Sequence, residues 1–138
     1  MKKLLAVLLL VGLCGCSAAQ LKQEFIGYFA SDVKASKNKQ TQSFDMSASD
    51  CITKVKDVLK IMGAVVRENR RRQYLTADNF QNAFRSAIDT TPVGILVTST
   101  TANKCRVEIA SNNPSLAVFV SGVISKKLNP RPEEETTK

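Results

Sequence analysis

The chain contains no histidine, and this absence removes several kinds of chemistry. Serine–histidine and cysteine–histidine nucleophile pairs both need an imidazole, which is also the commonest general base. Imidazole is a frequent metal ligand as well. The sequence therefore predicts no catalytic residue and no metal site, and we expect a protein that is not an enzyme.

Motifs that mark phosphate binding or acyl transfer are also missing. The sequence has no glycine-rich phosphate loop and no serine in a nucleophile elbow. Two carboxylates can hydrolyse glycosides, but the acidic residues of the central region show no arrangement beyond that of solvated charges: Asp57, Glu68, Asp78 and Glu108. We expect no cofactor apart from the lipid described below.

The first residues have the pattern of an export signal. Two lysines follow Met1, and an apolar run extends from Leu4 to Leu13. The run is about ten residues long, whereas a helix that crosses the roughly 30 Å hydrocarbon core needs about twenty. We expect residues 1–15 to be a signal peptide that is removed.

The apolar run ends in Leu13-Cys14-Gly15-Cys16, which resembles the lipobox of bacterial lipoproteins. The resemblance implies cleavage after Gly15, a covalent lipid with palmitate-type chains on Cys16, and a stable membrane anchor. Cys14 departs from the pattern, because Ala, Ser or Thr is commoner there. The alternative is an ordinary secreted protein that is cut nearby.

The residue after the lipidated cysteine bears on the membrane. Ser17 stands where an Asp favours inner-membrane retention in enteric bacteria. The lipoprotein resemblance therefore implies the periplasmic side of the outer membrane, or the cell membrane in a Gram-positive host. Because Lys2 and Lys3 leave with the signal, the formal charge falls from +8 to about +6. Such a charge favours anionic surfaces, and in this compartment we expect no nucleic-acid partner.

Residues 16–46 are predicted to be a lipidated tether. Leu21, Phe25, Tyr28 and Phe29 have the spacing of one side of a helix, and residues 34–42 read as a polar, flexible linker. The apolar side chains either rest on the bilayer or the domain, or dock into a partner subunit. Phe25, Tyr28 and Phe29 are therefore candidate partner-docking residues.

Residues 47–129 have the pattern of one folded domain. Apolar spacings predict a helix that begins near Ser47 or Ser49 and ends at Gly63, and a second helix capped by Asn113 with Pro114 in its first turn. Two hairpins and a short helix or structured loop lie between them: residues 64–77, 93–110 and 78–88. Residues 130–138 read as a disordered tail.

This order of elements predicts an α+β fold, a two-layer sandwich in which two helices cover one face of an antiparallel sheet of about four strands. The other face is expected to be open, with Tyr74 and Leu96 on it, and to offer a docking surface. Cys51 and Cys105 both point toward the core by periodicity. They are a candidate disulfide that closes a loop of some 54 residues and adds about 4 kcal/mol, and the alternative is two buried free thiols.

Arg70, Arg71 and Arg72 form the densest charge cluster of the chain. Their simplest role is a solvated hairpin tip. The alternative is an anion-binding site, because guanidinium groups pair well with carboxylate and phosphate oxygens.

The segments "GAVVREN", "YLTADN", "VGILVTST" and "KCRVEIAS" between two helices give residues 47–128 a resemblance to small helix-on-sheet domains of Gram-negative envelope lipoproteins. These include accessory subunits of outer-membrane assembly and secretion complexes. The resemblance carries no site residues across. Together with the anchor, it predicts a non-enzymatic outer-membrane lipoprotein that is a structural or accessory subunit with protein partners. The alternative is a binding module for an anionic envelope ligand such as peptidoglycan or lipopolysaccharide.

Overall fold

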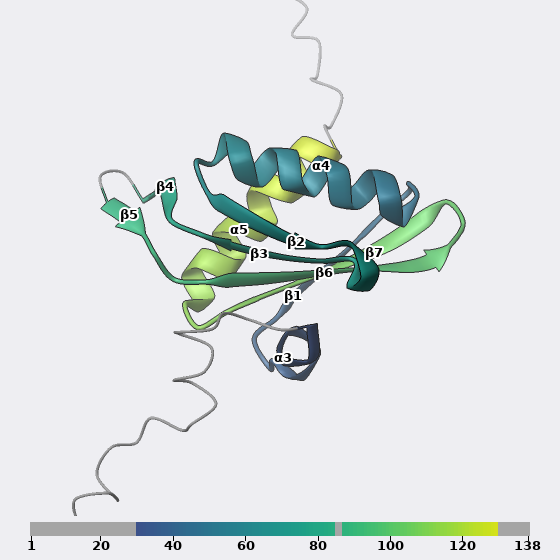
Figure 1. The fold of residues 1–138 in the computed structure, drawn as a ribbon, viewed down its shortest axis with the longest axis horizontal. Helices are drawn as coiled ribbons and strands as arrows, with labels where there is room; N and C mark the ends of the chain where they lie inside the picture. Colours follow the sequence, from purple (N-terminus) through teal and green to yellow (C-terminus); the bar gives the residue numbers. More distant parts are fainter. Residues whose placement is uncertain (1–29, 85–86, 130–138) are drawn as a thin grey trace, which may run out of the picture.

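The computed structural model describes residues 30–84 and 87–129, with residues 82–84 and 87 described by backbone alone. The centre of the fold is an antiparallel sheet with strand order β1-β7-β6-β3-β2 (Figure 1). These strands are β1 Gln40–Phe44, β2 Val65–Asn69, β3 Tyr74–Asp78, β6 Val93–Thr101 and β7 Lys104–Ser111. A separate ribbon of β4 Phe80–Phe84 and β5 Ala87–Asp89 lies beyond one end of the sheet.

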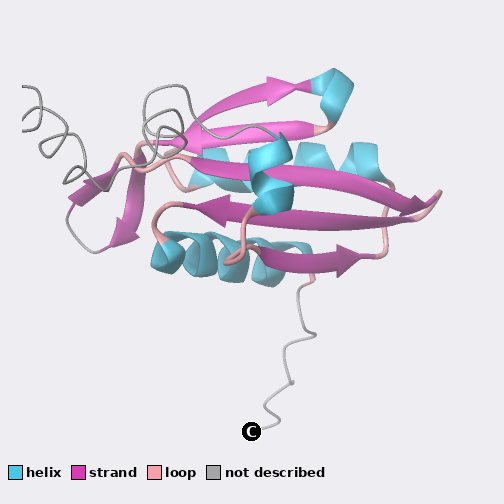
Figure 2. Cartoon of the chain, turned by 90° about the horizontal axis from the view of Figure 1, so that it is seen from below, coloured by secondary structure: helices cyan, strands magenta, loops and turns pink. Residues whose placement is uncertain are grey.

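Helices lie on both faces of this sheet. α4 (Ala48–Ile61) and α5 (Pro114–Leu128) cover one face, which we call the inner face. α3 (Ala30–Ala35) crosses the opposite, outer face, as the view from below shows (Figure 2). The α+β class and the helical layer predicted from sequence are therefore confirmed.

Both long helices begin at the predicted caps. The Ser47 hydroxyl accepts a hydrogen bond from the Asp50 amide at 3.1 Å, and the Asn113 side chain accepts from the first amides of α5. Pro114 occupies the first turn of α5, where its missing N–H costs nothing. Gly63 follows α4 with φ +74°, a left-handed conformation that favours glycine.

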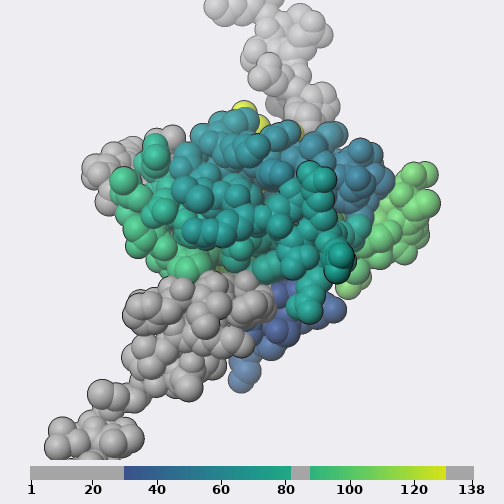
Figure 3. All heavy atoms as spheres, viewed as in Figure 1, coloured from purple at the N-terminus to yellow at the C-terminus, as the bar shows by residue number. Residues whose placement is uncertain are grey.

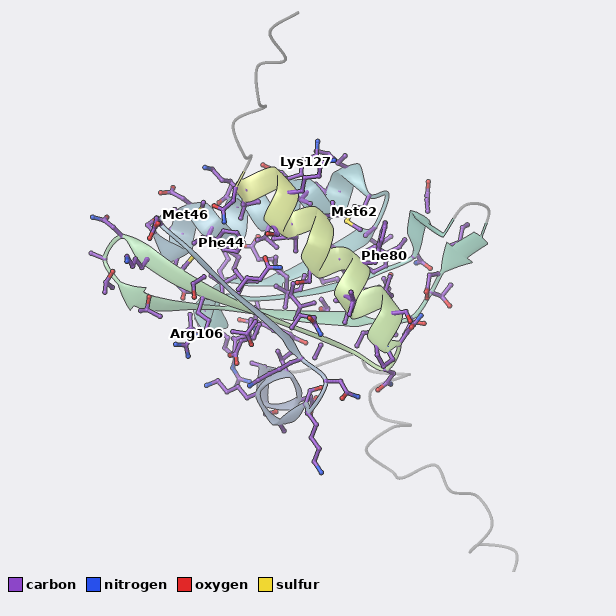
Figure 4. All side chains as sticks on the ribbon, turned by 180° about the vertical axis from the view of Figure 1, so that it is seen from behind. Phe44, Met46, Met62, Phe80, Arg106 and Lys127 are labelled. Carbon is purple, nitrogen blue, oxygen red and sulfur yellow. The ribbon has the colours of Figure 1, made fainter. Side chains whose placement is uncertain are left out.

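The main core fills the space between the inner face and the two helices. Every second residue of β6 and β7 points into it, and α4 contributes a buried stripe. The largest side chains that are fully buried there are Leu59, Leu75, Phe80, Ile95, Ile109, Leu116 and Ile124. Phe44 lies on this side of the sheet, whereas Arg106 points away from it (Figure 4).

The linker prediction for residues 34–42 is wrong at both ends, because residues 34 and 35 belong to α3 and residues 40–42 belong to β1. Residues 40–44 form β1, the fifth strand, which pairs with β7 along one edge. Apart from Phe44 this strand is polar, so it carries no apolar signal. Gln42 points inward and donates from Nε2 to the Ser121 carbonyl of α5 at 2.9 Å, which lets a polar side chain occupy the inner face.

The prediction for residues 78–88 is also wrong, because this segment forms β4 and β5 rather than a helix or a loop. Phe80, Phe84 and Ile88 recur every four residues. Phe80 and Phe84 both belong to β4, and an even spacing of four suits a strand as well as a helix, whereas Ile88 belongs to β5. The hairpin of residues 64–77 is confirmed, with a 3₁₀ turn at Arg70–Arg72 between its strands.

Candidate functional site

The predicted anchor and the predicted docking residues fall outside the described part of the chain. Cys16, Phe25, Tyr28 and Phe29 all precede Ala30, where the described residues begin. Their roles stay predictions. Over residues 30–84 and 87–129, no helix is both long enough and apolar enough to span a bilayer.

The outer face carries a small apolar cluster beneath α3. Val33 is fully buried there against Tyr74 of β3, Leu96 of β6 and Ala110 of β7. Register confirms this placement, because Tyr74 pairs directly with Leu96 and Leu96 with Glu108. Tyr74 and Leu96 therefore lie on the predicted face, but the prediction that this face is open is wrong where α3 covers it.

Ion pairs flank this cluster on the outer face. Lys39 contacts Glu108 of β7 at 2.7 Å, and Arg67 of β2 contacts Asp78 of β3 at 2.6 Å. The side chain of Arg67 is about two-thirds exposed and that of Glu108 is mostly buried. The outer face thus carries a short apolar strip with ion pairs on either side. α3 packs on this strip.

The arginine tip is the 3₁₀ turn formed by Arg70, Arg71 and Arg72. All three side chains are exposed, and Gln73 closes the turn with φ +49°. The Arg70 Nε lies 3.3 Å from Glu68 Oε1, while 85% of the Arg70 side chain stays accessible. The tip is therefore solvated, as predicted, and its guanidinium groups are accessible to an anion.

A groove joins this tip to α4, which lies beside the β2–β3 hairpin on the face shown in Figure 3. It has a volume of about 460 Å³. Its lining residues come from one side of α4 and from the hairpin: Ser49, Ile52, Thr53, Lys56, Asp57, Lys60, Glu68, Arg70 and Gln73. We call this the basic groove. Sequence reasoning found Arg70 but missed Lys56 and Lys60, which looked like an ordinary solvated helix face.

Two acidic residues, Asp57 and Glu68, also line the basic groove, and Glu68 pairs with its cations. Lys56 Nζ donates to Glu68 Oε2 at 2.5 Å, and Arg70 contacts the other carboxylate oxygen. The hydrogen bond from Lys56 is the main reason that the pKa of Glu68 lies below its usual value, and the nearby charges of Lys56 and Arg70 lower it further. Among the described residues, Lys60 makes no ion pair with a carboxylate. The groove therefore keeps cationic groups available.

Cys51 and Cys105 are brought together inside the main core. Both are fully buried free thiols that belong to the same core cluster, on the packed elements α4 and β7. Burial raises the pKa of the Cys51 thiol, and the neighbouring Cys105 raises it further. The prediction that both point into the core is confirmed. The residues described here contain no group of three or more histidine, cysteine, aspartate or glutamate side chains that would suit a metal.

No protein-family model matches the chain, and no curated protein shows significant sequence similarity to it. The lipoprotein resemblance therefore rests on the quoted residues alone.

Proposed function

We propose that the protein is a lipid-anchored accessory subunit of a bacterial envelope complex, without catalytic activity of its own. The observation that carries the proposal is the order of features along one short stretch. A lipobox ending at Cys16 is followed by an apolar segment, and that segment leads directly into α3 on the outer face. The outer membrane, periplasmic side, is the proposed location.

The fold supports this reading through its division into two faces. α4 and α5 bury the main core on the inner face, so the domain is complete on that side. α3, the first described element of the chain, lies on the outer face and covers a small apolar cluster there. Because the apolar segment directly precedes α3 in the sequence, we expect a partner bound to that segment to lie near the outer face.

Affinity purification of the full chain from detergent-solubilised membranes tests the docking role. Replacing Phe25, Tyr28 and Phe29 with serine should release the protein from larger species, because the apolar contact area is lost. The matched control replaces Lys22 and Gln23 in the same segment and should leave the assembly intact. Equal recovery of large species from both variants would contradict the docking role.

The same variants separate docking from packing against the domain. Phe29 precedes the buried Val33 by four residues, the spacing of one helix face. If the apolar segment only covers its own domain, the triple variant should lower the midpoint of thermal unfolding while partners stay bound. If it docks, partners should be lost with the midpoint little changed.

The basic groove favours a second candidate function, the binding of an anionic envelope ligand. Arg70 lies in one groove with Lys56 and Lys60, so more than one cation faces the same space. Binding to lipopolysaccharide vesicles and to isolated peptidoglycan is the direct test. Replacing Arg70, Arg71 and Arg72 with glutamine should weaken binding and reduce its salt dependence.

A control with the same charge change replaces Lys37, Lys126 and Lys127, which are exposed and lie outside the groove. If binding uses the groove, this control should bind nearly as well as the wild type. Equal losses in both triple variants would show that net charge alone drives adsorption, and the groove would have no specific role.

A further inference from the structure

Cys51 and Cys105 lie 54 positions apart in the sequence, yet both belong to the main core, where α4 packs against β7. Cys51 lies in the first turn of α4, and Cys105 lies near the start of β7. Both side chains are fully buried. A bond between them would therefore join the helical layer to the sheet.

Both backbones are held independently of the thiols. The Cys51 amide donates to the Ser47 carbonyl at 2.9 Å at the capped start of α4. Cys105 pairs with Phe44 of β1 on one side and with Ser99 of β6 on the other. Folding alone orders both backbones, through the hydrogen bonds of α4 and β7. A bond between the sulfurs therefore carries little additional entropic cost.

We propose that Cys51 and Cys105 form a disulfide that links α4 to β7. The bond forms by thiol–disulfide exchange with an oxidised dithiol or with glutathione disulfide. The two thiols of the chain lose two protons and two electrons, one sulfur–sulfur bond forms, and the oxidant's disulfide is reduced to two thiols. The proposal rests on the proposed function in one respect only, since export supplies the oxidising compartment.

Burial has a consequence for the order of events. Neither sulfur is exposed in the folded domain, and the raised pKa of Cys51 keeps its thiol protonated. The thiolate is the species that attacks a disulfide, so exchange is slow in the native state. The bond therefore forms while the chain folds and is protected once folding is complete.

Peptide mapping without a reducing agent tests the bond on the wild-type chain. One sample is extracted from host membranes with N-ethylmaleimide present from lysis, and a second is refolded in glutathione disulfide. Trypsin places Cys51 in residues 40–54 and Cys105 in residues 105–106, whereas both signal-region cysteines fall in residues 4–22. A linked species of residues 40–54 and 105–106, with loss of alkylation at both cysteines, is expected in each sample.

The refolded sample decides the proposal. Alkylation of both cysteines there, with no linked species, would overturn it. A link in the refolded sample but not in the membrane extract would keep the pairing and instead contradict export to an oxidising compartment. Cys51→Ala is the control variant. It should abolish the linked species and leave Cys105 fully alkylated in denaturant.

Discussion

At the scale of single residues, Gly63 and Gly122 differ in whether their backbone and surroundings would accept a side chain. Gly63 has φ +74°, and a Cβ atom there would lie 2.9 Å from Gln81 Cβ. Gly122 lies inside α5, is exposed, and has open space around the position of a Cβ. Only the first position needs the conformational freedom of glycine.

Alanine at these two positions should therefore change stability in opposite directions. Gly63→Ala should lower the free energy of unfolding by about 1–2 kcal/mol, because a left-handed alanine is strained. Gly122→Ala should raise it by about 0.5–1 kcal/mol, because alanine favours the helix. Urea denaturation followed by circular dichroism measures both. Changes of the same sign would contradict the placement of Gly63 as the residue that ends α4.

Glu68 makes stability depend on pH. Its pKa is lowered in the fold, so the folded state favours the charged carboxylate. This contribution is fully present above the ordinary pKa of about 4.5 and is lost as pH falls through the lower, folded value. The stability advantage of the wild type over Glu68→Gln should therefore shrink below pH 4.5. Thermal unfolding across this acid range tests the sign.

Lys56 provides a check on the cause. Its hydrogen bond is the largest contribution to the lowered pKa of Glu68. In Lys56→Gln, stability should therefore fall less steeply in acid than in the wild type. Adding Glu68→Gln to this variant should change the acid dependence only a little more. A full pH dependence in Lys56→Gln would assign the effect to another cation, with Arg70 as the next candidate.

At the scale of elements, α3 is the least firmly held helix. It has six residues, and Val33 is its one fully buried side chain. A helix this short has little stability of its own and depends on tertiary contact. Its docking on Tyr74 and Leu96 covers the small apolar cluster of the outer face.

Val33→Asp should undock α3 without unfolding the domain. The burial of one valine is worth about 1.5–3 kcal/mol, and an undocked α3 lets the new carboxylate reach water. Hydrogen exchange should speed up in residues 30–35 and leave β6 and β7 protected. Ser31→Asp, at an exposed position of the same helix, is the control. Unchanged exchange in Val33→Asp would mean that other contacts hold α3.

The sequence predicts those helices and strands that bury one face of apolar side chains and leave the other face in solvent. The stripe of α4, the cap at Asn113 and the alternation in β7 each follow from side-chain period and cap chemistry. β1 escapes prediction because the Nε2 of its inward Gln42 donates to Ser121 of a helix 79 positions away, which no local pattern contains. The basic groove escapes for the same reason, since Lys56 and Glu68 meet only in the folded chain.

At the scale of the whole molecule, the two faces of the sheet differ in role: the inner face is buried in the main core, and the outer face is the proposed contact surface. The inner face holds the main core, including Cys51 and Cys105. The outer face is covered in part by α3, the first described element of the chain. The basic groove opens beside α4, away from α3. The outer face with α3 and the arginine tip are therefore separate surfaces of the domain.

Mild crosslinking in living cells tests the proposed role most directly, when it is followed by detergent extraction, sizing and mass spectrometry of wild type and Cys16→Ala. We expect the wild type to be recovered in a large species with defined neighbours. We expect Cys16→Ala to be lost from that species, because the lipid no longer holds it at the membrane. Recovery of the wild type only as a small free species would contradict the subunit role and turn attention to ligands of the basic groove.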